Sequence, residues 1–241
     1  MINSCYLMGL PERFKDLCEI YPPLVKDVLE NRKFSQYETA LTITKQDIED
    51  EFAESSPELM ELTPFKYLLL NSMANEDFLQ VVIESFKFFI HEDVAVLPEL
   101  EVIIIGKLEE DIDPRVDLDD PRLITEENYF EFQNAIRISL GREPEEPPDL
   151  EEDPRIKRIK AKARYRDRLI AKRQKAPSLG TYLTAICCMG VGLNPLNIGE
   201  ITYASVNYLI NMYQQKEEYN VNIKSLLAGA KDVKLKYWIR N

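Results

Sequence analysis

The chain offers few side chains for catalysis. His91 is the only histidine, so multi-histidine metal centres and most histidine relays are excluded unless this residue serves. It follows the end of an expected helix, where an imidazolium interacts with the helix dipole, so a structural role is favoured. No GxxxxGK phosphate loop and no GxSxG elbow occurs in the sequence. We therefore predict a protein that is not an enzyme and needs no cofactor.

Acidic clusters and cysteines are the other candidates for chemistry. Acids gather at residues 49–51, 109–113 and 117–120, but none of these runs has the spacing and the glycine of a calcium loop. Solvated acidic surface is the favoured interpretation, and no metal site is predicted. Cys187 and Cys188 are adjacent, which leaves a vicinal redox pair open but favours two small apolar helix residues.

The strongest signal is a reversal of charge in the middle of the chain. Residues 143–153 carry seven acids and no base, and residues 155–175 then carry eleven bases and one acid. The basic segment has a net charge of +10, so the rest of this −12 chain sums to −22. A basic element inside an acidic protein is either a docking surface or an internal counter-charge.

The basic segment is predicted to be a helix of about 20 residues, because it lacks Pro and Gly and is rich in helix formers. Ile156, Ile159, Ala163 and Ile170 form a thin apolar stripe, which Arg166 interrupts. Nucleic-acid binding is disfavoured because only Tyr165 offers a stacking platform, and membrane binding because the stripe lacks Trp and Phe. A recognition helix for an acidic helical protein and a solvated linker helix remain. The candidate partner-binding residues are Arg155, Lys157, Arg158, Lys160, Lys162, Arg164, Arg168 and Lys172.

The elements that must position this segment are mostly helical. Val102–Ile105, ended by Gly106, gives the best strand signal and indicates a small hairpin. Thr125 is expected to cap a helix that ends before Gly141 at C′, and Asp47 to complete a capping box with Thr44. Further helices are expected near residues 11–20, 24–34, 64–71, 76–90, 182–189, 197–217 and 222–230, followed by an extended end at 233–241.

Four prolines in residues 142–154 rule out a continuous helix there and predict a stiff, extended, solvated linker. The expected fold is therefore mainly α with a minor β-hairpin, in two helical parts joined by this linker and the long basic helix. We predict an N-terminal domain over 1–142, the linker over 143–154, and the basic helix with a C-terminal helical domain over 155–241. No run is long and apolar enough to span a membrane, and the start lacks a basic leader, so the expected location is a cytoplasm.

Several sequence segments, taken in their order along the chain, resemble those of one protein family. They are IYPPLVKDVL, LTITKQDIEDEF, LTPFKYLLL, RLITEENYFEFQNAIR and the closing block from TYLTAICCMGVGL to SLLAGAKDVKLKYWIRN. Together they are similar to tail assembly chaperone-like proteins of phages and prophages of Gram-positive bacteria. The acidic linker and the basic helix are the least patterned part of this resemblance, which offers no motif residues to carry over one by one.

The resemblance implies a non-enzymatic factor in the host cytoplasm that acts in virion morphogenesis. Proteins of this kind coat the long, helical tape measure protein, help to recruit tail tube subunits, and are absent from finished tails. A homo-oligomer is compatible with this picture. Two rival hypotheses stay open: a structural or adaptor protein of the phage virion, and a nucleic-acid-binding phage protein that uses residues 155–175.

Overall fold

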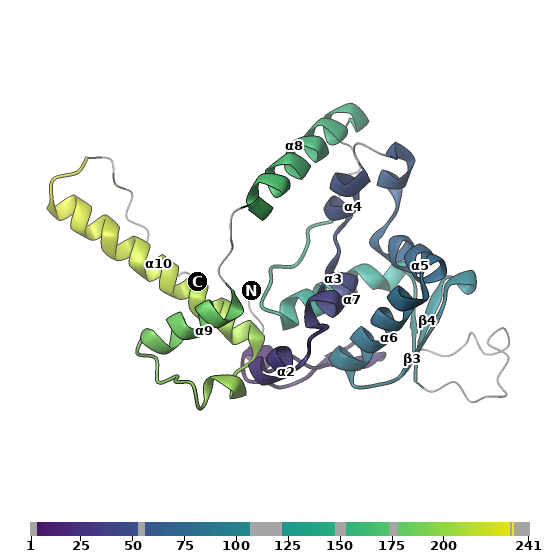
Figure 1. Cartoon of the computed structure of the whole chain (residues 1–241), viewed down its shortest axis with the longest axis horizontal. Helices are drawn as coiled ribbons and strands as arrows, with labels where there is room; N and C mark the ends of the chain where they lie inside the picture. The colour runs from purple at the N-terminus through teal and green to yellow at the C-terminus, as the bar shows by residue number, and fades with distance from the viewer. Residues whose placement is uncertain are drawn as a thin grey trace.

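The computed structural model describes residues 4–52, 56–106, 122–147, 153–173, 178–231 and 233. Its described part is mostly helical, with two small antiparallel sheets (Figure 1). The expected fold class, mainly α with a minor β-hairpin, is confirmed. The expected extended end at 234–241 lies outside the described residues, and so do residues 148–152 of the linker.

The N-terminal segment corrects the first predicted helix. After α1 (Ser4–Leu7), the chain forms an antiparallel hairpin of β1 (Glu12–Phe14) and β2 (Cys18–Ile20). Lys15 turns the chain in the left-handed region, with φ of 50°. A helix over 11–20 cannot form around this turn, and the hairpin instead buries Phe14, Leu17, Cys18 and Ile20.

The next helices pack in succession. They are α2 (Val25–Glu30), α3 (Phe34–Thr42), α4 (Lys45–Phe52), the 3-10 helix η1 (Pro57–Glu61), α5 (Pro64–Ala74) and α6 (Glu76–Ile90). Thr63 and Asn75 cap α5 and α6 by accepting hydrogen bonds from Lys66 N and Phe78 N. His91 ends α6 in the left-handed region, and its ring stacks on Tyr21 with centroids 4.1 Å apart.

The predicted hairpin is confirmed as part of a three-stranded antiparallel sheet. β3 (Val94–Leu97), the 3-10 helix η2 (Pro98–Leu100), β4 (Val102–Ile105) and β5 (Leu123–Ile124) follow one another, and β4 lies in the centre with Val94 opposite Ile105. Thr125 then opens α7 (Glu126–Ser139) with a capping box. Gly141 follows α7 with φ of 72°, as expected for C′.

The main core is aromatic. Phe86 of α6 and Phe132 of α7 are fully buried, and their rings stack with centroids 5.2 Å apart and planes 6° apart. Phe14 packs edge-on against Phe132 at 5.5 Å, which ties the N-terminal hairpin to α7. This cluster unites the hairpin, α3, α5, α6, α7 and the three-stranded sheet in one body.

The C-terminal elements are α8 (Pro154–Arg173), α9 (Leu179–Cys188), the 3-10 helix η3 (Ile198–Glu200) and α10 (Tyr203–Leu227). Ser178 caps α9, Asn197 heads only η3, and Thr202 caps α10. The separate helix expected from residue 222 is wrong, because α10 continues without a break to Leu227. Polar residues at 220 and 222 are tolerated there since they are not buried.

The first turns of α10 join the C-terminal elements to the body, and its far end projects away from it (Figure 1). Val25 N donates to Ile201 O at 2.9 Å, and Tyr203 N donates to Pro23 O at 2.8 Å. Val25 also packs in a second apolar cluster with Leu183, Ile186, Ile198 and Val206. The division of the chain into domains at residues 142 and 155 stays a prediction.

Candidate functional site

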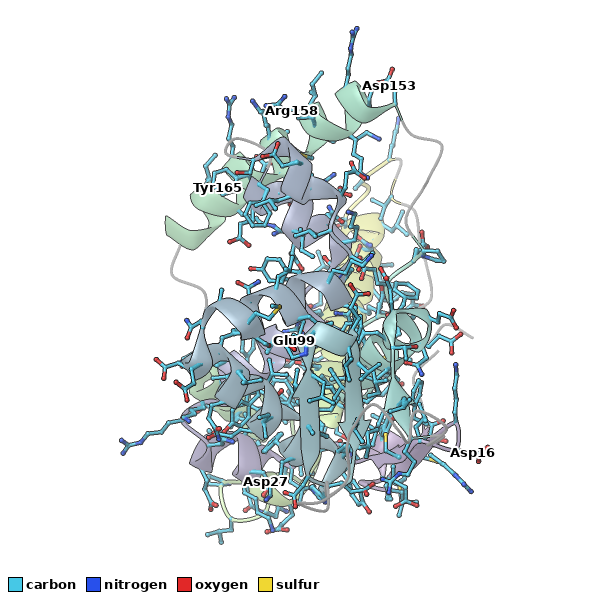
Figure 2. The ribbon with its side chains drawn as sticks, turned by 90° about the vertical axis from the view of Figure 1, so that its right-hand side faces the viewer. Asp16, Asp27, Glu99, Asp153, Arg158 and Tyr165 are labelled. Atoms are coloured by element: carbon cyan, nitrogen blue, oxygen red, sulfur yellow. The ribbon has the colours of Figure 1, made fainter. Side chains whose placement is uncertain are left out.

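The basic segment forms one uninterrupted helix, α8, as the sequence predicts. It begins at Pro154, because proline fits the first helical position, where no N–H is needed. The helix lies beside α4 at one end of the molecule (Figure 1). In Figure 2 it crosses the top of the view, with Arg158 on the side away from the body.

The face of α8 toward the body is set by four residues: Lys157, Ala161, Arg164 and Arg168. Their spacings of four, three and four place them on one side of a helix. Ala161 is fully buried and packs in a small cluster with Met60 and Phe52. Its short side chain lets the helix approach closely, so that the flanking bases reach the acids of α4.

Contacts between ionised side chains of the described residues join the two helices. Lys157 Nζ lies 2.9 Å from Glu49 Oε1. Arg164 Nε donates to Asp50 Oδ1 at 2.8 Å, and Arg164 Nη2 lies 3.5 Å from Glu49 Oε2. Arg168 Nη2 lies 2.7 Å from Asp47 Oδ1 and 3.1 Å from Asp50 Oδ2. The network means that each base of this face meets at least one acid of α4.

Hydrogen bonds at the start of α4 fix Asp47 independently of α8, and the other acids follow it along the same helix. Asp47 Oδ2 accepts from Thr44 N at 2.8 Å and from Thr44 Oγ1 at 2.7 Å, which confirms the predicted capping box. Glu49 and Asp50 follow on the next turn, with side chains 7% and 1% exposed. Acids this deeply buried need paired cations.

Asp50 is the most enclosed acid in the network. Burial raises the pKa of its carboxyl above the ordinary value, although Arg164 and Arg168 act in the opposite direction. Among the described residues Oδ2 accepts no hydrogen bond, because Arg168 approaches it as an ion pair without hydrogen-bond geometry. Burial therefore outweighs pairing in setting the pKa of this carboxyl.

The opposite face of α8 carries the predicted apolar stripe, and it is exposed. Ile156, Ile159 and Ile170 are 49%, 69% and 57% exposed, and Ala163 is exposed with them. Basic side chains border the stripe on the solvent side, namely Arg155, Arg158, Lys160 and Arg166. The helix is thus amphipathic in an unusual sense: its charged face is docked, and its apolar stripe meets water.

The eight candidate residues fall into separate groups. Lys157, Arg164 and Arg168 face the acids of α4, whereas Arg155, Arg158 and Lys160 lie on the exposed side. Lys162 is half-buried, and the side chain of Lys172 lies outside the described residues. The segment is therefore an internal counter-charge on one face, and the use of its exposed basic face as a docking surface stays a prediction.

The sequence interpretation missed the acids that receive the basic helix. It assigned residues 49–51 to solvated surface, which is wrong for Glu49 and Asp50, both buried. The available signal was the position of Ala161 between Lys157 and Arg164, since a small residue flanked by bases on one face marks a close, charge-lined contact. That pattern does not identify which acidic cluster is the partner.

Among the described residues, no three His, Cys, Asp or Glu side chains are grouped to hold a metal ion. Within the same residues, no helix is both long and apolar enough to cross a membrane. Cys187 is half-buried, Cys188 is exposed, and both are free thiols.

Comparison with known families gives a match for the C-terminal part of the chain. Residues 171–241 match the family described as YomV second domain, which covers α9, η3, α10 and the end of α8. The family name is associated with a Bacillus phage region, and this is consistent with a phage protein. No curated protein and no solved structure matches the chain.

Proposed function

We propose that the chain is a non-enzymatic phage protein that binds other proteins during tail assembly, through the outer face of α8. The observation that carries the proposal is the exposed stripe of Ile156, Ile159 and Ile170 on a helix whose opposite face is anchored. A helix held in this way presents its stripe rigidly, which lowers the entropy cost of binding.

The chemistry of the face specifies the partner. Exposed isoleucines at helical spacing fit an apolar groove or the apolar side of another helix. The bordering arginines and lysines fit acidic side chains on that partner and orient it. A tape measure protein is long and helical, and tail tube subunits are the second candidate. The match of residues 171–241 to a phage-associated family supports a phage setting.

Nucleic-acid binding is less well supported by the same geometry. Lys157, Arg164 and Arg168 already neutralise acids of α4, so they offer less to phosphates. The remainder of the chain outside 155–175 has a charge of −22, which repels a polyanion. The absence of a phosphate loop and of a histidine cluster in the sequence supports a non-enzymatic role.

The test measures binding of tape measure fragments and tail tube protein to the native chain and to a triple variant, Ile156→Ser, Ile159→Ser and Ile170→Ser. We expect affinity for one of them to fall at least about tenfold, because each lost isoleucine removes buried apolar area. Leu196→Ser is the matched control, since Leu196 is 95% exposed on a different segment.

Three outcomes contradict the proposal. They are the absence of binding to any tail protein, equal binding by the triple variant, and a mobility shift of nucleic acid at low salt that Arg158→Glu abolishes. Stoichiometric presence of the chain in purified virions would instead favour a structural or adaptor protein. Hydrogen exchange over α8 in the triple variant shows whether the helix remains docked.

A further inference from the structure

A cavity of about 290 Å³ lies where α4, η1, α5, α7 and α8 meet. Its apolar lining comes chiefly from Pro64, Phe65, Tyr129 and Phe130. Phe65 and Tyr129 are 1% exposed and their ring centroids lie 5.1 Å apart, so this wall is a fixed part of the core. The hydroxyl of Tyr129 is buried and has no hydrogen-bond partner among the described residues. A buried phenol without a partner indicates a missing ligand or water.

Glu145 contributes a second buried polar atom of the cavity that lacks a hydrogen-bond partner among the described residues. Its backbone is fixed on α7, because Glu145 N donates to Asn134 Oδ1 at 2.7 Å and Asn134 Nδ2 donates to Glu145 O at 3.2 Å. The expected solvated linker is therefore wrong at this residue, since the fixed backbone turns its side chain into the cavity wall. The carboxylate accepts a backbone hydrogen bond from Lys45, but its Oε2 is buried and has no hydrogen-bond partner among the described residues.

The other charged side chains of the lining differ in the partners that they have. Lys45 Nζ donates to the carbonyls of Met60 and Leu62, and Lys157 is paired with Glu49. Glu61 interacts electrostatically with Lys45 and opposes the lowering of the Lys45 pKa by burial. Glu145 Oε2 has no hydrogen-bond partner among the described residues.

The third acid of the lining is satisfied. Glu126 Oε2 lies 3.2 Å from Lys66 Nζ, and Glu126 Oε1 accepts from Thr63 Oγ1 at 2.9 Å. Among the described residues no cation therefore forms an ion pair with Glu145 Oε2, and the same cavity offers three aromatic rings. Aromatic faces and carboxylates are the two groups that recognise an ammonium ion with an apolar body.

We infer that this cavity binds an organic cation, a primary ammonium group on an apolar stem, which donates to Glu145 Oε2 and packs against Phe65, Tyr129 and Phe130. This site is independent of the outer face of α8 and goes beyond the proposed function. The ligand is either a free amine or a lysine side chain of a bound peptide, because the two share the recognised chemistry.

The pH dependence of binding follows from the state of Glu145. Burial raises its pKa to about 7, and Arg137 acts in the opposite direction. A cation prefers the ionised carboxylate, so affinity is full above this pKa and falls as the pH drops below it. The charged groups around Glu145 are Asp47, Glu49 and Lys45 of α4, Glu61 of η1, Glu126 and Arg137 of α7, and Lys157 of α8.

The test titrates the full chain with 4-methylbenzylamine and, as matched probes, 4-methylbenzyl alcohol and 4-methylbenzoate, by calorimetry. We expect the amine to bind at least about tenfold more tightly than either probe, since a charge-assisted hydrogen bond is roughly twice as strong as a neutral one. Binding of the amine at pH 6 should be weaker than at pH 8 by about tenfold. N-acetyl-lysine methylamide, tested in parallel, separates a peptide side chain from a free amine.

Two variants locate the site. Glu145→Gln should weaken binding of the amine about tenfold or more and remove its pH dependence. Glu146→Gln makes the same charge change on the neighbouring exposed residue and should leave affinity within about twofold. Tyr129→Phe removes the buried hydroxyl to which the ammonium group can also donate. It should therefore weaken binding less than Glu145→Gln, and it keeps the test informative if Glu145→Gln unfolds.

The inference is overturned by any of three results. One is the absence of saturable binding of both amines at millimolar concentration. Another is equal or tighter binding of the alcohol or the carboxylate. The last is unchanged affinity in both Glu145→Gln and Tyr129→Phe. None of these results bears on the binding of tail proteins by α8, so failure here and failure of the proposed function are distinguishable.

Discussion

Two helix–helix contacts of this molecule are built from different side chains: aromatic rings around Phe132, and charged groups around Arg164. Phe132 joins α7 to α6 through stacked rings that are fully buried. Arg164 joins α8 to α4 through carboxylates, and the described apolar contribution is the small cluster of Ala161, Met60 and Phe52. Apolar burial involves no ionisable group, whereas the contact of α8 depends on the carboxylates of Glu49 and Asp50, which are 7% and 1% exposed and which salt therefore screens little. The contact of α7 with α6 is thus independent of ionisation, and the contact of α8 with α4 depends on it.

The largest effect is expected from Phe132→Ala. Removing this ring leaves a cavity between Phe86 and Phe14, so the free energy of unfolding should fall by about 3–5 kcal/mol. Chemical denaturation followed by circular dichroism measures the change. A loss below about 1 kcal/mol would show that the stacked rings are not the main support of the body.

A smaller and local effect is expected from Arg164→Ala. The variant leaves Asp50 and Glu49 with fewer cations, a loss on the order of 1–3 kcal/mol, which undocking of α8 limits by returning both acids to water. Hydrogen exchange should show lower protection over residues 154–173 with the body unchanged. Arg166→Ala is the control, because Arg166 is an exposed base of the same helix. Unchanged protection in Arg164→Ala, or an equal loss in Arg166→Ala, would contradict a contact held by charge.

The smallest effect is expected from Glu84, an ionic contact on the surface of the body. Hydrogen bonds from Lys33, Tyr37 and Gln80 lower the pKa of Glu84 from 4.5 to about 2. A depressed pKa stabilises the fold above the unfolded pKa, and this contribution is lost as the pH falls from about 4.5 towards 2. Denaturation at pH 5 and pH 2.5 should show a smaller acid-induced loss for Glu84→Gln than for the native chain. An equal loss in both would show that Glu84 does not stabilise the packing of α3 on α6.

Elements with strong local signals were predictable from the sequence. Val102–Ile105, α7 with Thr125 and Gly141, and α8 each have a cap, a breaker or a uniform composition that determines them. The hairpin at residues 12–20 was not predictable, because its strands have three residues each and show no clear alternation. Gly141 illustrates both cases: its role as C′ is local, but a Cβ there would lie 2.8 Å from the Cα of Ala204, a contact with α10 that no local pattern shows.

Of the candidate site, only the basic side was predictable from the sequence, because its signal is local. The bases of α8 are evident from composition, and their helical spacing separates the face with Ala161 from the face with Ile159. The acids that receive them were not identifiable, because Arg164 and Asp50 are 114 residues apart in the sequence. Contacts between such distant segments depend on the whole fold.

This separation also orders events during synthesis. α4 ends at Phe52 and α8 begins at Pro154, so the ribosome adds roughly 100 residues between them, which takes about 5–20 s at typical elongation rates. During this interval Asp50 and Glu49 are made and exposed without Lys157, Arg164 and Arg168. A nascent chain of this protein therefore displays an acidic patch that the finished chain covers, and a cationic chaperone or a basic segment of another nascent chain has its best access at that stage.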